Sequence, residues 1–146
     1  MSIAMTRTLG AVLLAALMSA LPALAVDTGG TDTPSMQEVR TDIKAERWQD
    51  AVDKLTLIVD ADTTNADAYN LLGYALRHLD RTDRAMQAYK RALKLDPNHK
   101  GALEYQGVLF VMLGDLDGAR ANLDKLEAIC GTKCEEYEDL AEAIGG

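Results

Sequence analysis

The feature that most constrains the fold is a set of small and large apolar residues spaced for a helix-turn-helix unit between residues 66 and 99. Gly73 and Ala85 are small, so two helices can approach each other closely at these positions. The space around them is filled by Tyr69, Leu72, Leu76, Tyr89 and Ala92. Pro97 ends the second helix, because proline lacks a backbone N–H and clashes with the preceding turn.

These residues fill every position of a 34-residue pattern: an aromatic, Leu-Gly, an aromatic or Leu, Ala, a second aromatic and Pro. Residues 66–99 therefore resemble a tetratricopeptide repeat. The resemblance implies an all-α fold, a right-handed superhelical array of about three helix pairs with a C-terminal capping helix. It also implies a protein that binds partners and is not an enzyme.

The 34-residue period continues on the C-terminal side, where it defines a looser third repeat over residues 100–133. This repeat has Gln106 where Leu is usual, and Gly131 where Pro97 stood in repeat two. The residues predicted to pack the two repeats are Tyr69, Leu72, Gly73, Leu76, Ala85, Tyr89, Ala92, Pro97, Gly107, Phe110, Ala119 and Leu123.

A first repeat is expected over residues 32–65, and its second helix has apolar residues at the expected positions. Its first helix fits less well, because the period puts Ser35, Glu38, Val39 and Asp42 at the packing positions. A shift of one residue places Met36, Val39 and Ile43 on one face and implies a turn one residue shorter.

Two pairs of residues mark helix starts in the sequence. Thr33 and Pro34 suit the N-cap and first position of the first helix. Asp115 and Asp117 suit the start of a later helix, because acidic side chains are favourable near a helix N-terminus.

The N-terminal segment predicts export. Arg7 precedes an apolar run from Leu9 to Leu21, and Ala23-Leu24-Ala25 forms a cleavage site, so residues 1–25 resemble a secretory signal peptide. The apolar run is shorter than the about 20 residues that a membrane-spanning helix needs. We expect cleavage after Ala25, a flexible leader over residues 26–33, a repeat domain over residues 34–146 and a periplasmic location.

The charge argues against nucleic acid as a partner. The whole chain has a formal net charge of −8, and the part after residue 25 keeps 14 basic and 23 acidic side chains. Proteins that bind nucleic acid need a basic patch that displaces counterions from the phosphates. We interpret the acidity as a means of solubility, with a cationic partner as the less favoured alternative.

Cys130 and Cys134 form the only cysteine pair in the sequence. In an exported chain a close pair favours a disulfide, which here would fix a terminal helix over residues 134–144 against the last repeat. That helix has one apolar face, and a solenoid needs a cap over its last repeat. The apolar residues of this helix are Tyr137, Leu140, Ala141 and Ile144.

The cysteine pair also allows an alternative in which the two thiols have a chemical function. The spacing of Cys130 and Cys134 resembles the copper-handling motif of the exported copper chaperones of cytochrome oxidase, a resemblance that implies Cu(I) and a distant histidine. Because His78 and His99 suit a helix end and a turn, we expect neither of them to be a ligand. We predict no metal and no other cofactor, and keep a thiol-based copper or redox factor as the alternative function.

Motifs for catalysis are not found: the sequence has no phosphate-binding Gly-rich loop, no zinc-protease motif and no nucleophile elbow. We therefore predict a scaffold or adaptor whose partner is a protein or peptide. Self-association through an exposed helix face stays an open alternative for so short an array.

The resemblance also predicts where the partner binds, since the first helix of each tetratricopeptide repeat lines a concave groove. The carboxylate clamp of the chaperone-binding members is not expected, because Gly101 and Tyr105 replace its Lys and Arg. Val108 and Met112 are assigned either to an apolar strip with Tyr74 or to packing against a neighbouring helix. The predicted groove residues are Asp67, Asn70, Tyr74, Arg77, His78, Glu104, Val108 and Met112.

Overall fold

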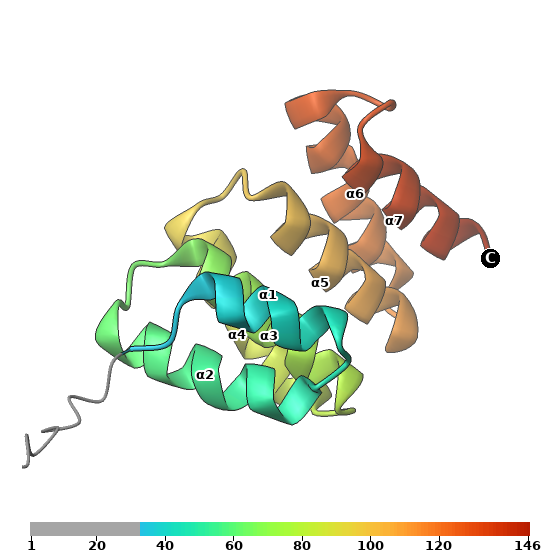
Figure 1. Cartoon of the computed structure of the whole chain (residues 1–146). Helices are drawn as coiled ribbons and strands as arrows, with labels where there is room; N and C mark the ends of the chain where they lie inside the picture. The colour runs from blue at the N-terminus through green and yellow to red at the C-terminus, as the bar shows by residue number, and fades with distance from the viewer. Residues whose placement is uncertain (1–32) are drawn as a thin grey trace, which may run out of the picture. The chain divides into compact units, whose positions relative to one another are not determined.

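Residues 33–146 are described by the computed structural model, and this part of the chain forms seven α-helices and no strand (Figure 1). The predicted signal peptide and all but the last residue of the predicted leader lie outside the described residues. The helices are α1 (Met36–Lys44), α2 (Trp48–Ala61), α3 (Ala66–His78), α4 (Thr82–Leu95), α5 (Lys100–Met112), α6 (Leu116–Cys130) and α7 (Glu135–Gly145).

The helices pack as consecutive pairs. Each first helix contacts its own second helix, as α3 contacts α4, and each second helix also contacts the first helix of the next pair, as α4 contacts α5. Helix α7 lies beside α5 and α6 (Figure 1), in the place that the first helix of another repeat would take. The predicted all-α helical solenoid is therefore confirmed.

The turn inside each pair repeats at 34-residue intervals. Glu46, Asp80 and Gly114 all have a positive φ, of 55°, 56° and 79°. In each turn the residue that follows donates its N–H to a carbonyl five residues earlier, for example from Arg81 to Leu76 at 2.9 Å. Since repeat one has the same turn as the others, the predicted turn one residue shorter is wrong.

The regular turn places Asp42 of α1 where Leu76 lies in repeat two. Asp42 is only 2% exposed, and it forms ion pairs with Arg47 and with Lys54. Hydrogen bonds from Lys54 and then Arg47 lower the pKa of this carboxyl. Repeat one therefore buries a neutralised charge at a position where repeat two buries an apolar side chain.

The apolar face predicted for the first helix is nevertheless present. Val39 is fully buried, and Met36 and Ile43 pack against the same cluster of core residues. Helix α1 thus contributes both an apolar contact and a buried ion pair to its partner α2.

The predicted start of α1 is wrong by two residues. Ser35, and not Thr33, is the N-cap: its hydroxyl accepts from the N–H of Glu38 at 3.2 Å, and the Glu38 carboxylate accepts from the N–H of Ser35. This reciprocal pair is a capping box, which satisfies two free N–H groups at once. The predicted start of α6 is confirmed, because the Asp115 carboxylate accepts from the N–H of Gly118 at 2.9 Å.

Repeat two has a tight contact between its two helices. A Cβ atom placed on Gly73 would lie 2.6 Å from the ring of Tyr89, whose side chain is fully buried. Of the other residues predicted to pack this repeat, Tyr69 is half-buried and Pro97 is exposed, so Pro97 acts by ending α4. The buried ones are Leu72, Leu76, Ala85 and Ala92.

Repeat three is packed differently, through α7. A Cβ atom on Gly107 would lie 2.5 Å from Leu140, which is fully buried against Leu103 and Leu126. Of the other residues predicted to pack this repeat, Ala119 is buried, whereas Phe110 and Leu123 are half-buried.

The unusual Gln106 of repeat three has a buried partner. Asn122 donates from its amide nitrogen to the Gln106 side-chain oxygen and to the backbone carbonyl of Leu103, both at 3.0 Å. A hydrogen bond between two buried amides thus replaces the apolar contact that Leu makes in repeat two.

Helix α7 continues the 34-residue period. The period carries the packing positions of repeat three onto the apolar face of α7: Tyr137, Leu140, Ala141 and Ile144. Between residues 33 and 146, no helix combines the length and the apolar character that crossing a membrane requires.

Candidate functional site

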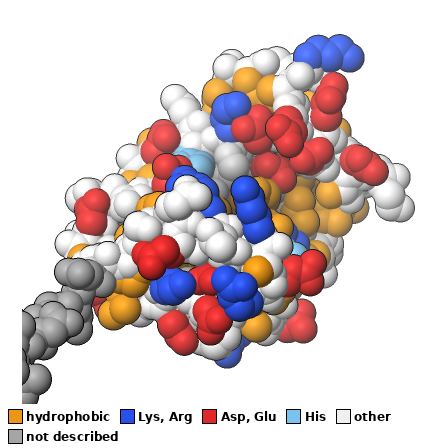
Figure 2. Space-filling model, in the orientation of Figure 1, with side chains coloured by type: hydrophobic (Ala, Val, Ile, Leu, Met, Phe, Trp, Pro, Cys, Tyr) orange, Lys and Arg blue, Asp and Glu red, His pale blue; other side chains and the backbone are white. Residues whose placement is uncertain are grey.

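The predicted groove residues lie on α3 and α5, the first helices of repeats two and three. We call the face that carries them the groove face. On the side of the molecule seen in Figure 2, acidic side chains gather over the α5 and α7 end next to hydrophobic surface, and side chains of both charges are mixed over the α1–α4 end.

An aromatic strip runs along the groove face from α2 to α5. The Trp48 ring stacks on the ring of His78 with 4.0 Å between centroids, and Tyr74 lies 4.6 Å from His78. Tyr74 in turn lies 4.7 Å from Tyr105 of α5. The strip thus comprises Trp48, His78, Tyr74 and Tyr105, with Tyr74 at its centre.

Arg77 borders this strip with a positive charge. Its guanidinium carbon lies 5.3 Å from the centre of the Tyr74 ring, within the range of a cation–π contact. One terminal nitrogen also lies 3.8 Å from the sulfur of Met112, and the buried Nε has no hydrogen-bond partner. Met112 itself is 53% exposed, so an apolar side chain is accessible beside the aromatic strip.

Two of the predicted groove residues have other roles. Val108 packs against the buried cluster around Leu140, so packing describes it better than an exposed strip. Asp67 is engaged by His99, whose Nε2 lies 2.9 Å from the carboxylate. His99 is also the N-cap of α5, since its Nδ1 accepts from the N–H of Ala102.

A polar pocket of about 320 Å³ opens at this end of the groove face. Asp67 and His99 line it together with Gly101 and Lys100 of α5 and Glu136 of α7. Charged side chains of both signs therefore surround this pocket.

Asn70 and Glu104 are the most buried polar residues of the predicted set, at 6% and 9% exposed. The Asn70 side-chain oxygen has no hydrogen-bond partner. Burial, followed by the carboxylates of Asp139, Glu136 and Glu135, raises the pKa of Glu104 to about 7. Glu104 is therefore a carboxyl group that titrates near neutral pH.

Two rings of the aromatic strip also have shifted pKa values. Burial, followed by the charge of Glu104, raises the pKa of the Tyr105 hydroxyl to about 12. Partial burial lowers the pKa of His78, and the neighbouring Arg77 lowers it further. Both shifts favour the neutral rings, so the strip presents uncharged aromatic faces at neutral pH.

Sequence reasoning missed Trp48, Tyr105 and the carboxylates of α7. Trp48 is the first residue of a second helix, a position that the repeat pattern does not assign to the groove. The carboxylates were missed because α7 was interpreted only as a cap. Extending the 34-residue period by one more repeat would have placed them next to α5.

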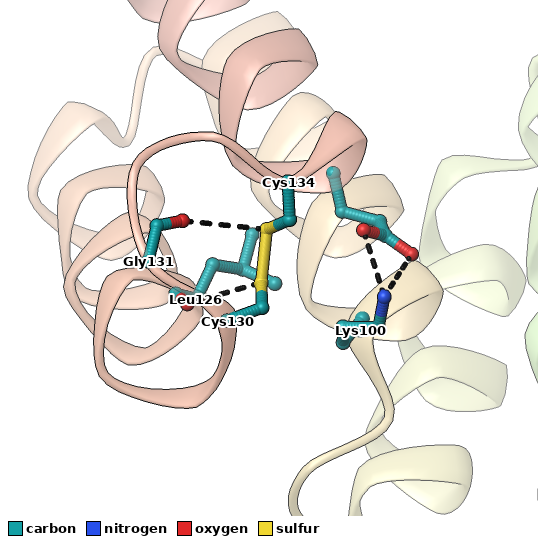
Figure 3. Close-up of a disulfide and its surroundings, with 6 residues drawn as sticks. Lys100, Leu126, Cys130, Gly131 and Cys134 are labelled. Atoms are coloured by element: carbon teal, nitrogen blue, oxygen red, sulfur yellow. Dashed lines mark hydrogen bonds and ion pairs between the residues drawn. A yellow bond between two sulfur atoms is a disulfide. The ribbon is translucent and has the colours of Figure 1, made fainter.

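Cys130 and Cys134 are joined by a disulfide bond that links the end of α6 to the N-cap of α7 (Figure 3). Next to it Lys100 of α5 forms an ion pair with Glu136 of α7 at 2.9 Å. These two links fasten the start of α7 to both helices of repeat three.

The cysteine sulfurs and a carboxylate oxygen of Glu136 lie within 4.8 Å of one another, the one group within residues 33–146 that could hold a metal ion. Cu(I) prefers thiolate ligands, and a disulfide offers none. The group can therefore serve as a metal site only when the cysteines are reduced.

Residues 66–99 match the family model described as tetratricopeptide repeat. Residues 66–99 are therefore a tetratricopeptide repeat. The match covers repeat two in full, and no curated protein sequence matches the chain at a significant level.

Solved structures of tetratricopeptide repeat proteins are similar to this chain over 75% of its length. A crystal structure of MamA has a TM-score of 0.66 and 27% sequence identity, and the match spans 64% of the MamA chain. PcrH in complex with the chaperone binding region of PopD has a TM-score of 0.64 and 24% identity over 81% of its chain. The TPR2B domain of yeast Sti1, in complex with pHsp70, has a TM-score of 0.66 and 19% identity over 91% of its chain.

Proposed function

We propose that this tetratricopeptide repeat protein is a non-enzymatic scaffold, adaptor or assembly factor that binds a segment of a partner protein on its groove face. Residues 1–25 favour a periplasmic site of action after cleavage behind Ala25. Proteins of the same fold have been solved with partner segments, as PcrH with PopD and yeast Sti1 with pHsp70.

The observation that carries the proposal is the continuous aromatic strip centred on Tyr74. Four rings from three helices meet at centroid distances of 4.0 to 4.7 Å, with Arg77 and the exposed Met112 beside them. Aromatic, Arg and Met side chains are the types that carry most binding energy at protein interfaces. The groove side chains are also held by mutual packing before any partner arrives, which lowers the ordering cost of binding.

Photocrosslinking in cells tests the proposal. A benzophenone amino acid in place of Tyr74 should give adducts with a discrete partner, identified by mass spectrometry after purification of the crosslinked chain. The matched control is the same amino acid in place of Lys90, which is exposed on α4. Adducts only with a second copy of this chain, or equal labelling from both positions, would overturn the proposal.

A second candidate function is a thiol-based copper or redox factor. The approach of both cysteine sulfurs and Glu136 to within 4.8 Å favours it. The test is an anaerobic titration of the chemically reduced protein with Cu(I) against a competing chelator, with the chain in which both cysteines are replaced by Ser as control. A reduction potential below about −300 mV would instead identify a structural disulfide.

A further inference from the structure

We infer that the groove takes up a lysine or arginine side chain of its partner between α3, α5 and α7, where the Glu104 carboxylate and the Asn70 amide oxygen accept its hydrogen bonds. This inference rests on the proposed binding function and adds the chemistry of the partner to it.

Glu104 is a buried acid without a counter-ion. It is 9% exposed, and within residues 33–146 it forms neither an ion pair nor a hydrogen bond. The neighbouring helix α7 adds further negative charge from Glu135, Glu136 and Asp139. A buried carboxylate in such surroundings is costly unless a cation pairs with it.

The cations near Glu104 already have other contacts. The guanidinium of Arg77 lies over the Tyr74 ring and against the Met112 sulfur. Lys100 is paired with Glu136 at 2.9 Å. The charge of Arg77 offsets part of the rise in the Glu104 pKa, but neither cation forms an ion pair with Glu104. Direct pairing with this carboxylate is therefore left for a cation from outside.

Asn70 supplies an independent second observation. Its side chain is 94% buried, and its Oδ1 has no hydrogen-bond partner. The Asn70 amide faces α5, because its Nδ2 lies 3.2 Å from the point where a Cβ on Gly101 would stand. Gly101 is one helical turn before Glu104, and the absence of a side chain there makes room for the Asn70 amide next to the His99 ring. An amide oxygen only accepts hydrogen bonds, and an ammonium or guanidinium group donates several.

The arrangement of the acids favours an organic cation over a metal ion. Within residues 33–146, the carboxylates of Glu104, Glu136 and Asp139 do not come together closely enough to form a metal-binding group. A guanidinium or ammonium group tolerates acceptors that are spread out, and its aliphatic stem needs apolar surface. Tyr74 and Tyr105, which lie 4.7 Å apart next to this space, provide that surface.

The pH dependence follows from the groups around Glu104. The pKa of about 7 in the free protein means that the carboxyl is about half protonated at neutral pH. A bound cation favours the ionised form, so the affinity for a basic peptide should rise between about pH 6 and pH 8 with release of a proton. The charged groups that act on Glu104 are Glu135, Glu136 and Asp139 of α7 and Arg77 of α3.

The experiment selects peptide ligands for the protein after residue 25 from a phage-displayed library of random 12-residue peptides. Peptides that bind the wild type are tested against Tyr74→Ala, Glu104→Gln and the matched charge control Glu127→Gln. Glu127 is exposed on α6, away from the groove residues. One selected peptide is also made with its basic residue replaced by norleucine.

The expected peptides contain a shared Lys or Arg, and they lose affinity by about 10-fold to 100-fold when Glu104 becomes Gln, whereas Glu127→Gln leaves the affinity unchanged. The norleucine peptide should lose affinity for the wild type to a similar extent. Because Glu104→Gln removes a buried charge, this variant is expected to fold, and circular dichroism checks it.

Three results distinguish the inferred uptake of a basic side chain from the proposed binding of a partner on the groove face. Peptides that bind in a Tyr74-dependent way but share no basic residue overturn the inference and leave the proposed function standing. Basic peptides that bind equally well to wild type and Glu104→Gln also overturn it. A library that yields no ligand at all contradicts both the inference and the proposed groove.

Discussion

Repeats two and three differ in what completes their cores. In repeat two, Gly73 of α3 is covered by Tyr89 of α4, so both members of the close contact belong to the same repeat. In repeat three, Gly107 of α5 is covered by Leu140 of α7, and Leu123 at the position of Tyr89 is only half-buried. The close contact of repeat two is thus made within the repeat, whereas that of repeat three depends on α7, the helix that follows it.

The difference shows how a departure from the repeat pattern is compensated. Repeat three replaces an apolar contact with the hydrogen bond between Asn122 and Gln106, and the side chain that covers Gly107 comes from outside the repeat. The same dependence gives α7 a role in the groove, since its carboxylates lie next to Glu104. The contact between α5 and α7 therefore affects both the stability of repeat three and the proposed binding of a cation.

The largest expected effect comes from Leu140→Ala. Removing this fully buried side chain leaves a cavity beside Gly107, and we expect a loss of about 2 to 5 kcal/mol in the free energy of unfolding. Hydrogen exchange followed by mass spectrometry should show faster exchange in α5–α7 than in α1–α4. Uniformly faster exchange would mean that the two regions are not distinct. Ile144→Ala is the control, because Ile144 is half-buried and its loss should cost less.

The two glycines provide a direct comparison of the two regions. Gly73→Ala should destabilise the protein by about 1 to 3 kcal/mol, because the Tyr89 ring is enclosed and cannot move aside. Gly107→Ala meets the end of the Leu140 side chain, which is also fully buried but can turn more easily than a ring, so a smaller loss is expected. Both substitutions gain about 1 kcal/mol in helix propensity, so this gain does not separate them. Chemical unfolding curves measure both variants. Equal losses would contradict the claim that the packing of repeat three is more adaptable.

Replacing both cysteines by Ser tests how α7 is fastened. Loss of the disulfide should lower the free energy of unfolding by about 2 kcal/mol on the chain-entropy model for so short a loop. The Lys100–Glu136 ion pair remains, so α7 should stay in place with faster exchange near residues 130–136. If exchange in α1 rises as much as in α7, the disulfide does not act locally. Unfolding of the wild type with and without reductant provides an independent check.

Glu104→Gln is the one variant that is expected to raise the free energy of unfolding, and only at high pH. In the folded protein the pKa of Glu104 is raised from 4.5 to about 7, so burial favours the protonated form. The contribution of this group to stability is thus greatest below about pH 4.5 and falls as the pH rises to about 7. At pH 8 the variant should be more stable than the wild type by about 1 to 2 kcal/mol, allowing for residual exposure, and at pH 4 the two should be equal. Thermal unfolding at both pH values measures the difference, and a variant that is less stable at pH 8 would contradict the assignment of Glu104 as an uncompensated buried acid.

Much of the fold follows from local pattern. The spacing of Gly73, Ala85 and Tyr89 predicts a helix pair without any tertiary information, because small and large side chains must alternate where two helices touch. The start of α6 at Asp115 was predicted from the chemistry of helix caps, and the apolar face of α1 from its period. The predicted turn of repeat one is wrong because the pattern requires an apolar residue where Asp42 lies. Only the structure shows that ion pairs with Arg47 and Lys54 allow this acid to be buried there.

The sequence by itself determined the repeat, its 34-residue period and the helix faces that pack, because these depend on residues close together along the chain. Tertiary structure decided the groove. The approach of Trp48 to His78, of Tyr74 to Tyr105 and of α7 to Glu104 joins residues from different repeats. Whether a polar side chain such as Asn70 is exposed or buried depends on what lies across from it in space, and local spacing carries no information about that.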